Sequence, residues 1–183
     1  MTLVQPSTPA PEAPPDPTRD ALRVYVAGAS AEIGRARGVI AALRARGLEI
    51  VHDWPAVIDA HGGRANTGLT DDERAAAAHE CWAAACNCDV LLLLVPHATT
   101  VGAWVELGAA LTTSALTIAS GATDDMRGTI FTAMCAPLFE RAPDSLGVVT
   151  DKDRRAAQER ADDDAIAWIA GYAHARSMRE AAK

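Results

Sequence analysis

Residues 89–95 (DVLLLLV) constrain the fold more than any other segment of the chain. The last six of them are all apolar, and a run of this length is far too short to span a bilayer. A strand that is apolar on both faces must be covered by helices on both sides of its sheet. The run therefore predicts the central strand of a three-layer α/β domain, and it gives no reason to expect a membrane partner.

Strand-like and helix-like segments alternate along the rest of the chain. The expected strands are 22–27, 48–54 and 115–119, and the expected helices are 31–46, 70–87, 102–114 and 151–175. Alternation of this kind predicts a parallel sheet with right-handed crossovers. We expect a flavodoxin- or Rossmann-like open sheet, mostly parallel, with strand order 2-1-3-4 and a fifth strand at 138–139 or 148–149.

Three shorter segments carry expectations of their own. Residues 55–69 have the composition of a long loop, a length typical of binding loops or lids. Thr70 and Glu73 form a capping box that opens the next helix. The consecutive aspartates 162–164 fan around the last helix, so we expect them to be solvated surface.

Composition divides the chain into a tail and a domain. Residues 1–20 hold six of the ten prolines and almost no large apolar side chain, which predicts a disordered tail. Residues 21–178 suit a single globular domain. The net charge of −7 lacks the basic surface that polymeric nucleic acid needs. No basic-then-apolar leader is recognisable, so we expect a cytoplasmic protein.

The cysteines do not form a convincing metal site. Cys81, Cys86 and Cys88 lie close to His79 in the sequence. Cys81 and Cys86 are five residues apart on a predicted helix and therefore diverge, and there is no second CxxC pair. We expect no metal and no cofactor.

Glu106 lies in a segment, GAWVELGAAL, whose other members are all apolar or glycine. Such surroundings disfavour an ionised carboxylate, so the position is either a solvent-facing edge or a working site. Trp104, Leu107 and Leu111 form a separate stripe at helical spacing that we expect to face the core. The residues one turn from Glu106 are small, which leaves room for a ligand on its face.

Ligands of open parallel sheets bind beyond the carboxyl ends of the strands, where the strand order reverses. If the first and third strands are neighbours, the segment 28–30, the loop 97–102 and the helix of Glu106 meet there. The helix starts after Ser30 and at Gly102 offer free amides to an anion. Taken one at a time, these residues fit ordinary turns and caps equally well.

Three features occur in a recognisable order: Tyr25 in the first strand, Asp89 before the apolar strand, and Gly102-x-x-x-Glu106-x-Gly108-x-Ala110. Together they resemble the nucleoside 2-deoxyribosyltransferase-like superfamily, which includes nucleoside 2-deoxyribosyltransferases and 2′-deoxynucleoside 5′-monophosphate N-hydrolases. The resemblance covers residues 22–120 and is most specific in the glycine–glutamate pattern. It implies a small nucleoside or nucleotide as the ligand and cleavage or transfer at an N-glycosidic bond.

The resemblance also implies roles for individual residues. Glu106 attacks or stabilises the anomeric carbon as the base departs, which suits a reaction through an oxocarbenium-like state. Tyr25 hydrogen-bonds this carboxylate, although it is equally a good strand residue. Asp89 also belongs to the motif, but it lies at the amino end of its strand, away from the expected site, so we expect it to be structural.

The substrate contacts that we expect from the crevice and the resemblance are Gly28, Ser30, Thr100 and Gly102. Thr100 takes the place of a serine that binds the 5′-phosphate in the hydrolases of the superfamily. The transferases often carry an aspartate there, so Thr100 favours a phosphorylated substrate or another ligand.

Three further residues lie near the same edge of the predicted sheet. Asp53 could donate a proton, Trp54 could stack on a base and His97 could contact the leaving base. Each also fits a structural role, as a loop-capping aspartate, a packed indole and a loop residue respectively.

Cys81 marks a departure from the superfamily, because the resemblance places a second aspartate at this position. The departure favours, as one alternative, a non-catalytic module that binds or senses nucleotides. A second alternative is an NAD glycohydrolase, since TIR-like domains use a comparable glutamate on a similar sheet. The resemblance further implies a homodimer in which the neighbouring subunit completes the pocket.

Overall fold

The sheet contains five strands in the order β2-β1-β3-β4-β5, and all neighbouring pairs are parallel. The computed structural model describes residues 21–63, 68–97, 100–127, 129–143 and 150–182. The strands are β1 (Arg23–Ala27), β2 (Glu49–Ile50), β3 (Val90–Leu94), β4 (Leu116–Ala122) and β5 (Leu138–Arg141). The predicted fold class is therefore confirmed, with the fifth strand at the first of its two expected places. The alternative at 148–149 and the tail predicted for 1–20 lie outside the described residues.

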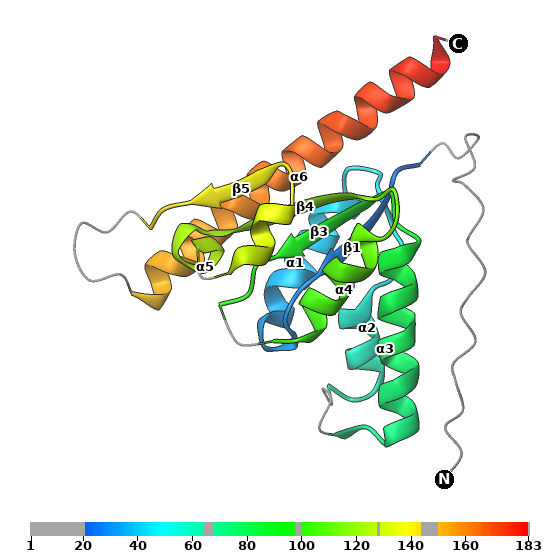
Figure 1. The fold of residues 1–183 in the computed structure, drawn as a ribbon, viewed down its shortest axis with the longest axis vertical. Helices are drawn as coiled ribbons and strands as arrows, with labels where there is room; N and C mark the ends of the chain where they lie inside the picture. The colour runs from blue at the N-terminus through cyan, green and yellow to red at the C-terminus, as the bar shows by residue number, and fades with distance from the viewer. Residues whose placement is uncertain (1–20, 64–67, 98–99, 128, 144–149, 183) are drawn as a thin grey trace.

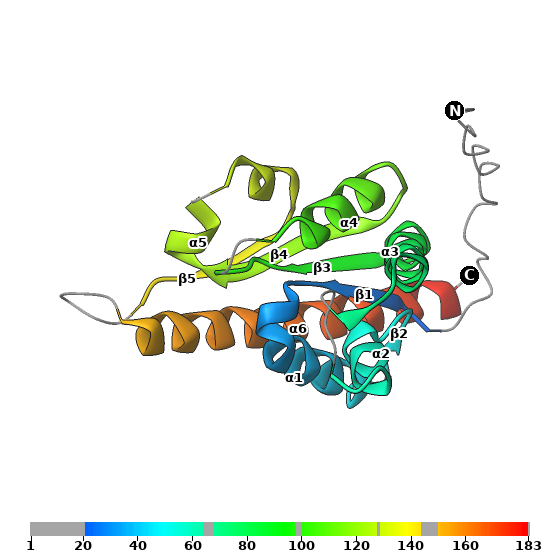
Figure 2. The same cartoon turned by 90° about the horizontal axis from the view of Figure 1, so that it is seen from below.

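Helices cover both faces of this sheet (Figure 1, Figure 2). On one face lie α1 (Ile33–Arg44), α2 (Trp54–Ala60) and the long α6 (Asp151–Ala181). On the other lie α4 (Gly102–Leu111) and α5 (Thr123–Arg127), and α3 (Asp71–Cys86) packs against α4. The described residues also include the 3₁₀ turns η1 (Ser30–Glu32) and η3 (Ile130–Met134).

Strand β3 is the centre of the core. All five of its residues are buried, and it pairs with β1 on one side and with β4 on the other. Because β3 carries apolar side chains on both faces, helices on both sides are needed to remove them from water. The loop that leaves its carboxyl end must therefore emerge beside the loop that leaves β1, and this juxtaposition creates the crevice.

The segment between β2 and α3 differs from the prediction of a long strand followed by a long loop. Strand β2 spans only Glu49–Ile50, and the chain then enters α2. Asp53 caps this helix, since its side chain accepts from the backbone N–H of Ala56. Pro55 stands in the first turn, where it removes no helical hydrogen bond. The predicted capping box of Thr70 and Glu73 is confirmed at the start of α3.

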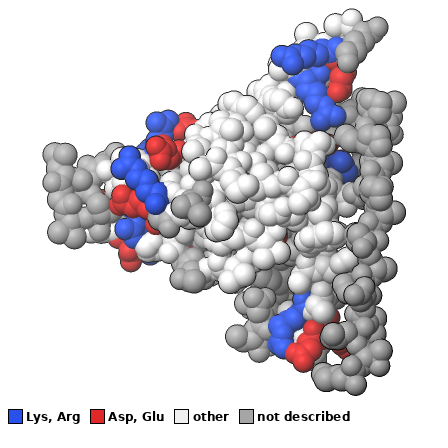
Figure 3. Space-filling view, viewed as in Figure 1, with Lys and Arg blue, Asp and Glu red and all other residues white. Residues whose placement is uncertain are grey.

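One surface of the molecule is almost free of charge. In Figure 3 the lysine, arginine, aspartate and glutamate side chains gather at the corners, while the centre of the face, over α4, is white. Its exposed apolar side chains come from α3, η3 and the start of α4: Trp82, Val101, Val105, Phe131 and Met134. No helix in the described part of the chain combines the length and apolarity that crossing a membrane requires.

Asp162 corrects the expectation that the three aspartates of α6 are solvated. It is only 4% exposed. Its carboxylate accepts two hydrogen bonds from Arg35 of α1, at 2.8 and 2.9 Å from Nε and Nη2, and one from the hydroxyl of Ser120 at 2.5 Å. The residue points inward because α6 lies flat on the sheet, so one of three consecutive positions must face β4. The sequence alone does not show which one has a partner for its charge.

We expect Asp162→Ala to lower the free energy of unfolding by about 3–5 kcal/mol, because it leaves the charge of Arg35 buried without its bidentate partner. The matched control is Asp163→Ala, which removes an exposed carboxylate from the next position of the same helix and should change stability by less than about 0.5 kcal/mol. Urea unfolding of both variants measures the difference. Equal stabilities would contradict the structural role of the Arg35–Asp162 pair.

Candidate active site

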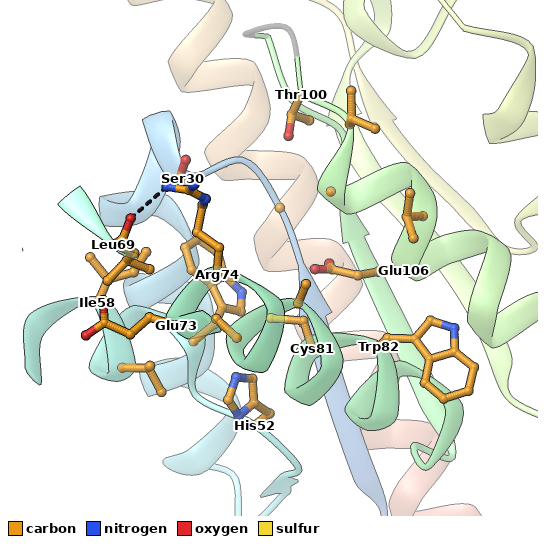
Figure 4. Close-up of a pocket in the computed structure, with 18 of the residues that line it drawn as sticks. Ser30, His52, Ile58, Leu69, Glu73, Arg74, Cys81, Trp82, Thr100 and Glu106 are labelled. Carbon is orange, nitrogen blue, oxygen red and sulfur yellow. Dashed lines mark hydrogen bonds between the residues drawn. The ribbon is translucent and has the colours of Figure 1, made fainter. Parts of the chain in front are cut away.

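A pocket of about 650 Å³ opens beyond the carboxyl ends of β1 and β3. This volume lies in the range of small-molecule sites. Six of the nine site residues predicted from the sequence line it: Gly28, Ser30, Trp54, Thr100, Gly102 and Glu106 (Figure 4). The structure thus brings the turn after β1 and the first turn of α4 to one cavity.

The two glycines leave space rather than relieve strain. A Cβ atom on Gly28 would lie 3.7 Å from Cβ of Leu94 and 3.8 Å from Cζ2 of Trp54, which are ordinary contacts. A Cβ atom on Gly102 would meet no atom within 4 Å. Both positions line the pocket, so glycine lets a ligand approach the backbone closely there.

Glu106 is held at the wall of the pocket by the packing of α4. Ala103, Leu107 and Ala110 are buried and form the side of the helix that rests on the sheet. Of the predicted core stripe Leu107 is fully buried, whereas Trp104 and Leu111 are partly buried and pack against the core; Trp104 also contacts Phe131. Small residues at 103 and 110 let α4 approach the sheet, and this orientation turns Glu106 toward α3 and the pocket (Figure 4).

Burial changes the acidity of Glu106. Loss of solvent disfavours the ionised form and raises the pKa from an ordinary 4.5 to about 7. Hydrogen bonding from Tyr25 and Cys81 opposes this rise and is the smaller effect. Its Oε2 atom is buried and makes no hydrogen bond of good geometry with any described residue. The site therefore contains a carboxylate whose pKa burial raises toward neutrality and whose Oε2 atom keeps an unused acceptor.

Tyr25 stands behind Glu106 on β1 and is completely buried. Burial, and secondly the negative charge of Glu106, raise the pKa of its phenol, so it remains a hydrogen-bond donor at every physiological pH. The hydroxyl is close enough to Glu106 and Cys81 to influence the pKa of both, although its geometry falls short of a well-formed hydrogen bond in the described residues.

Cys81 of α3 is the third member of this cluster. Burial and the neighbouring Glu106 raise the pKa of its thiol to about 11, which keeps it protonated and a poor nucleophile. In Figure 4 its sulfur and the Glu106 carboxylate point into the same cavity. Within the described ranges, no three histidine, cysteine or acidic side chains gather as metal ligands would.

The rest of the pocket is largely apolar. Trp54 is fixed by a 2.9 Å hydrogen bond from its indole N–H to the carbonyl of Val26. Side chains of α2, α3 and the segment before α3 extend this surface: Val57, Ile58, Leu69, Ala77 and Ala78. A flat aromatic ring has a suitable apolar environment here.

Tyr25, behind Glu106, does not line the pocket, and two other predicted site residues, Asp53 and His97, lie outside it as well. Asp53 caps α2 and accepts a hydrogen bond from Arg44. The His97 side chain turns away into a second cavity, where it contacts Asp125 at 3.1 Å and Arg154 at 3.1 Å. Their positions match the structural roles that the sequence also allowed.

Of α3, sequence reasoning singled out only position 81, through the resemblance, and missed the rest of the helix's contribution to the pocket. Its pocket-lining residues are Glu73, Arg74, Ala77, Ala78, Cys81 and Trp82. They are spaced at intervals of three or four along one face of the helix, so the pattern was available in the sequence. It was overlooked because alanines carry little hydrophobic signal and because the second wall of a pocket can be assigned only when the packing of α3 on α4 is known.

The fold and site together define an open parallel α/β protein with a pocket at the point where the strand order reverses. No protein-family profile matches the chain, and no curated protein matches it by sequence. Among solved structures it is similar to the CMP N-glycosidase BcmB of Clostridium botulinum, with 16% identity and a TM-score of 0.45. The match covers 75% of this chain and 95% of that one.

We expect Glu106→Gln to stabilise the fold above neutral pH. The folded state holds the Glu106 proton more tightly than the unfolded chain, so this contribution is complete below pH 4.5 and is lost as the pH rises through about 7. At pH 8 the free energy of unfolding of the variant should be about 2–3 kcal/mol higher than that of the parent. At pH 4 the two free energies of unfolding should differ little. Urea unfolding at both pH values measures this.

The control is Glu159→Gln, which neutralises an exposed glutamate on α6. Its free energy of unfolding should equal that of the parent at both pH values. A Glu106→Gln variant that is less stable than the parent at pH 8 would show that the ionised carboxylate is stabilised by the fold.

Proposed function

We propose that this protein cleaves or transfers at the N-glycosidic bond of a nucleoside or nucleoside 5′-monophosphate, with Glu106 as the nucleophile. The carboxylate attacks the anomeric carbon, the carbon–nitrogen bond breaks, and the base leaves with the bonding electron pair and takes up a proton. Water or an acceptor base then attacks the same carbon and releases Glu106.

The observation that carries this proposal is the environment of Glu106. Its carboxylate lines a pocket, has its pKa raised by burial to about 7, and keeps a buried oxygen without a good partner. Such an arrangement lowers the stability of the fold, and destabilising arrangements of this kind are common at active sites. The glycine–glutamate pattern around Gly102 and Glu106 supports the same assignment through its resemblance to the superfamily.

Tyr25 and Cys81 act on Glu106 rather than on the substrate in this proposal. Both are donors at neutral pH, because burial raises the pKa of each. Donation to the carboxylate favours its ionised form and fixes its orientation. They therefore counteract part of the effect of burial on the pKa of Glu106. A fraction of Glu106 then stays ionised and can act as the nucleophile.

The shape of the pocket suits a nucleoside. Glu73 and Cys81 both line it and are eight residues apart on α3, which corresponds to about 12 Å along the helix axis. The base would occupy the apolar end formed by α2 and α3, with the sugar beside Glu106. A phosphate would be held by the hydroxyls of Ser30 and Thr100 and by the amides at the start of α4, which has no side-chain cap.

We expect the parent protein to release free base from at least one member of a panel of nucleosides, 5′-monophosphates and NAD. Glu106→Gln should reduce this rate by about 1,000-fold or more, since it removes the nucleophile. The value of kcat/KM should rise with pH and level off above about 7, because only ionised Glu106 reacts. Chromatography of the released base measures the activity of the parent, the effect of Glu106→Gln and the pH dependence of kcat/KM.

The matched control is Glu73→Gln, a second pocket glutamate whose replacement can still form the capping box. It should lower the rate by less than about tenfold and leave the pH profile in place. Base exchange only in the presence of an acceptor base would identify transfer. Release that is unaffected by Glu106→Gln would contradict the proposal.

A non-catalytic nucleotide-binding module is the second candidate, and Cys81 is the observation that favours it. A thiol with a pKa of about 11 cannot replace a carboxylic acid as a proton donor to the leaving base. If none of the panel is cleaved but some members raise the melting temperature, the binding function holds and the enzyme proposal fails. Cleavage of NAD alone would support the glycohydrolase alternative.

We further propose a homodimer built on the uncharged face over α4. Copies of a chain with net charge −7 repel one another, and a face without charged groups is where they can meet with least repulsion. Val101 and Val105 are exposed on this face and also line the pocket, so a second copy would narrow its mouth. Sedimentation of the parent should show a dimer, and Val105→Asp should convert it to a monomer. A stable interface would hold at about 100 µM, so a monomeric parent at that concentration would contradict the proposal.

A further inference from the structure

The carboxylate of Glu32 joins the two loops that form the pocket. Glu32 ends η1, the turn that follows β1, and its Oε1 atom accepts a 2.7 Å hydrogen bond from the backbone N–H of His97, in the loop after β3. Its Oε2 atom accepts from Nη1 of Arg35 at 3.2 Å. Although Glu32 stands at the N-cap of α1, its side chain makes no capping bond to that helix. Ordinary capping therefore does not account for where its carboxylate points.

Arg35 gives this bridge a rigid support. Its guanidinium also donates to the carbonyl of Val95 at 2.9 Å and to that of Ser120 at 3.1 Å, which follow or belong to β3 and β4. The bidentate pair with Asp162 fixes the same group to α6. The whole guanidinium is thus occupied, and its orientation is determined by two strands and a helix.

Both loops joined by Glu32 carry substrate contacts of the proposed function. Ser30 precedes Glu32 by two residues, and Thr100 follows His97 by three. Glu32 and Arg35 themselves line the second cavity, of about 460 Å³, and not the pocket of Glu106. Because neither side chain lines that pocket, we take their effect on a ligand there to act through the loops.

We propose that Glu32, supported by Arg35, is a positioning residue that sets the distance between the Ser30 turn and the Thr100–Gly102 segment. Glu106 depends on it much less, because α4 is anchored separately by the buried Ala103 and Leu107. Loss of the bridge therefore weakens substrate binding while the chemical step is largely preserved. The kinetic part of this inference rests on the proposed function, and the structural part does not.

The test compares Glu32→Ala and Glu32→Gln with the parent and with Glu159→Ala, a control on exposed α6 surface. In Glu32→Ala the His97 amide should exchange its hydrogen at least about tenfold faster, while amides of α3 keep their rates. KM should rise about tenfold and kcat change by less than about threefold. Glu32→Gln retains an oxygen acceptor and should lie between the parent and Glu32→Ala in both measurements.

The exchange experiment decides the structural part without any activity. If the His97 amide exchanges at the parent rate in Glu32→Ala, the bridge does not hold the loop and the inference is wrong. If exchange accelerates but KM stays unchanged, or if kcat falls instead, the positioning role is wrong. If the parent releases no base from any substrate, the proposed function fails, and the exchange rates alone support or overturn the bridge.

Discussion

The complete burial of β3 is the constraint on which the rest of the structure depends. Its side chains are apolar on both faces, so the sheet must carry helices on both sides. The chain leaves β3 beside the end of β1, and α4 must return over the sheet at once. The pocket and the position of Glu106 follow from this packing, since α4 rests on the sheet through Ala103 and Leu107 and presents its remaining side to α3.

The carboxylate of Asp162 and the Oε2 atom of Glu106 are both withdrawn from solvent near this edge, and the fold treats the two groups in opposite ways. Asp162 has Arg35 and Ser120 as partners, so its charge is satisfied and it holds α6 to α1 and β4. Glu106 has only neutral donors nearby, and burial raises its pKa to about 7. The first arrangement stabilises the fold, whereas the second costs stability and keeps a carboxylate available to a ligand.

Much of the architecture could be predicted from the sequence, because apolar runs, helix periodicity and the capping box of Thr70 are local signals. Glu106 could be singled out for the same reason, as the one charge in an apolar helix. The short helix α2 was missed because Pro55 was taken as part of a loop rather than of a first helical turn. The extent 21–178 of a single domain stays a prediction.

The inward position of Asp162 could not be predicted, since its partner Arg35 lies 127 residues away in the sequence. Position 81 could be singled out only through the resemblance, because its place beside Glu106 depends on how α3 packs on α4, which no local pattern encodes. His97 shows the converse case. It lies in the expected loop, but the direction of its side chain is set by Asp125 and Arg154, far away in the chain.

The most direct test of the account is an NMR titration of the Glu106 carboxyl carbon in the parent protein and in Tyr25→Phe. We predict a midpoint near pH 7 in the parent, because burial outweighs the donors. The midpoint should move higher in Tyr25→Phe, which removes a donor that favours the ionised form. A Glu106 that titrates near its ordinary value of 4.5 in both proteins would show that the carboxylate is solvated, and the proposed site would lose its basis.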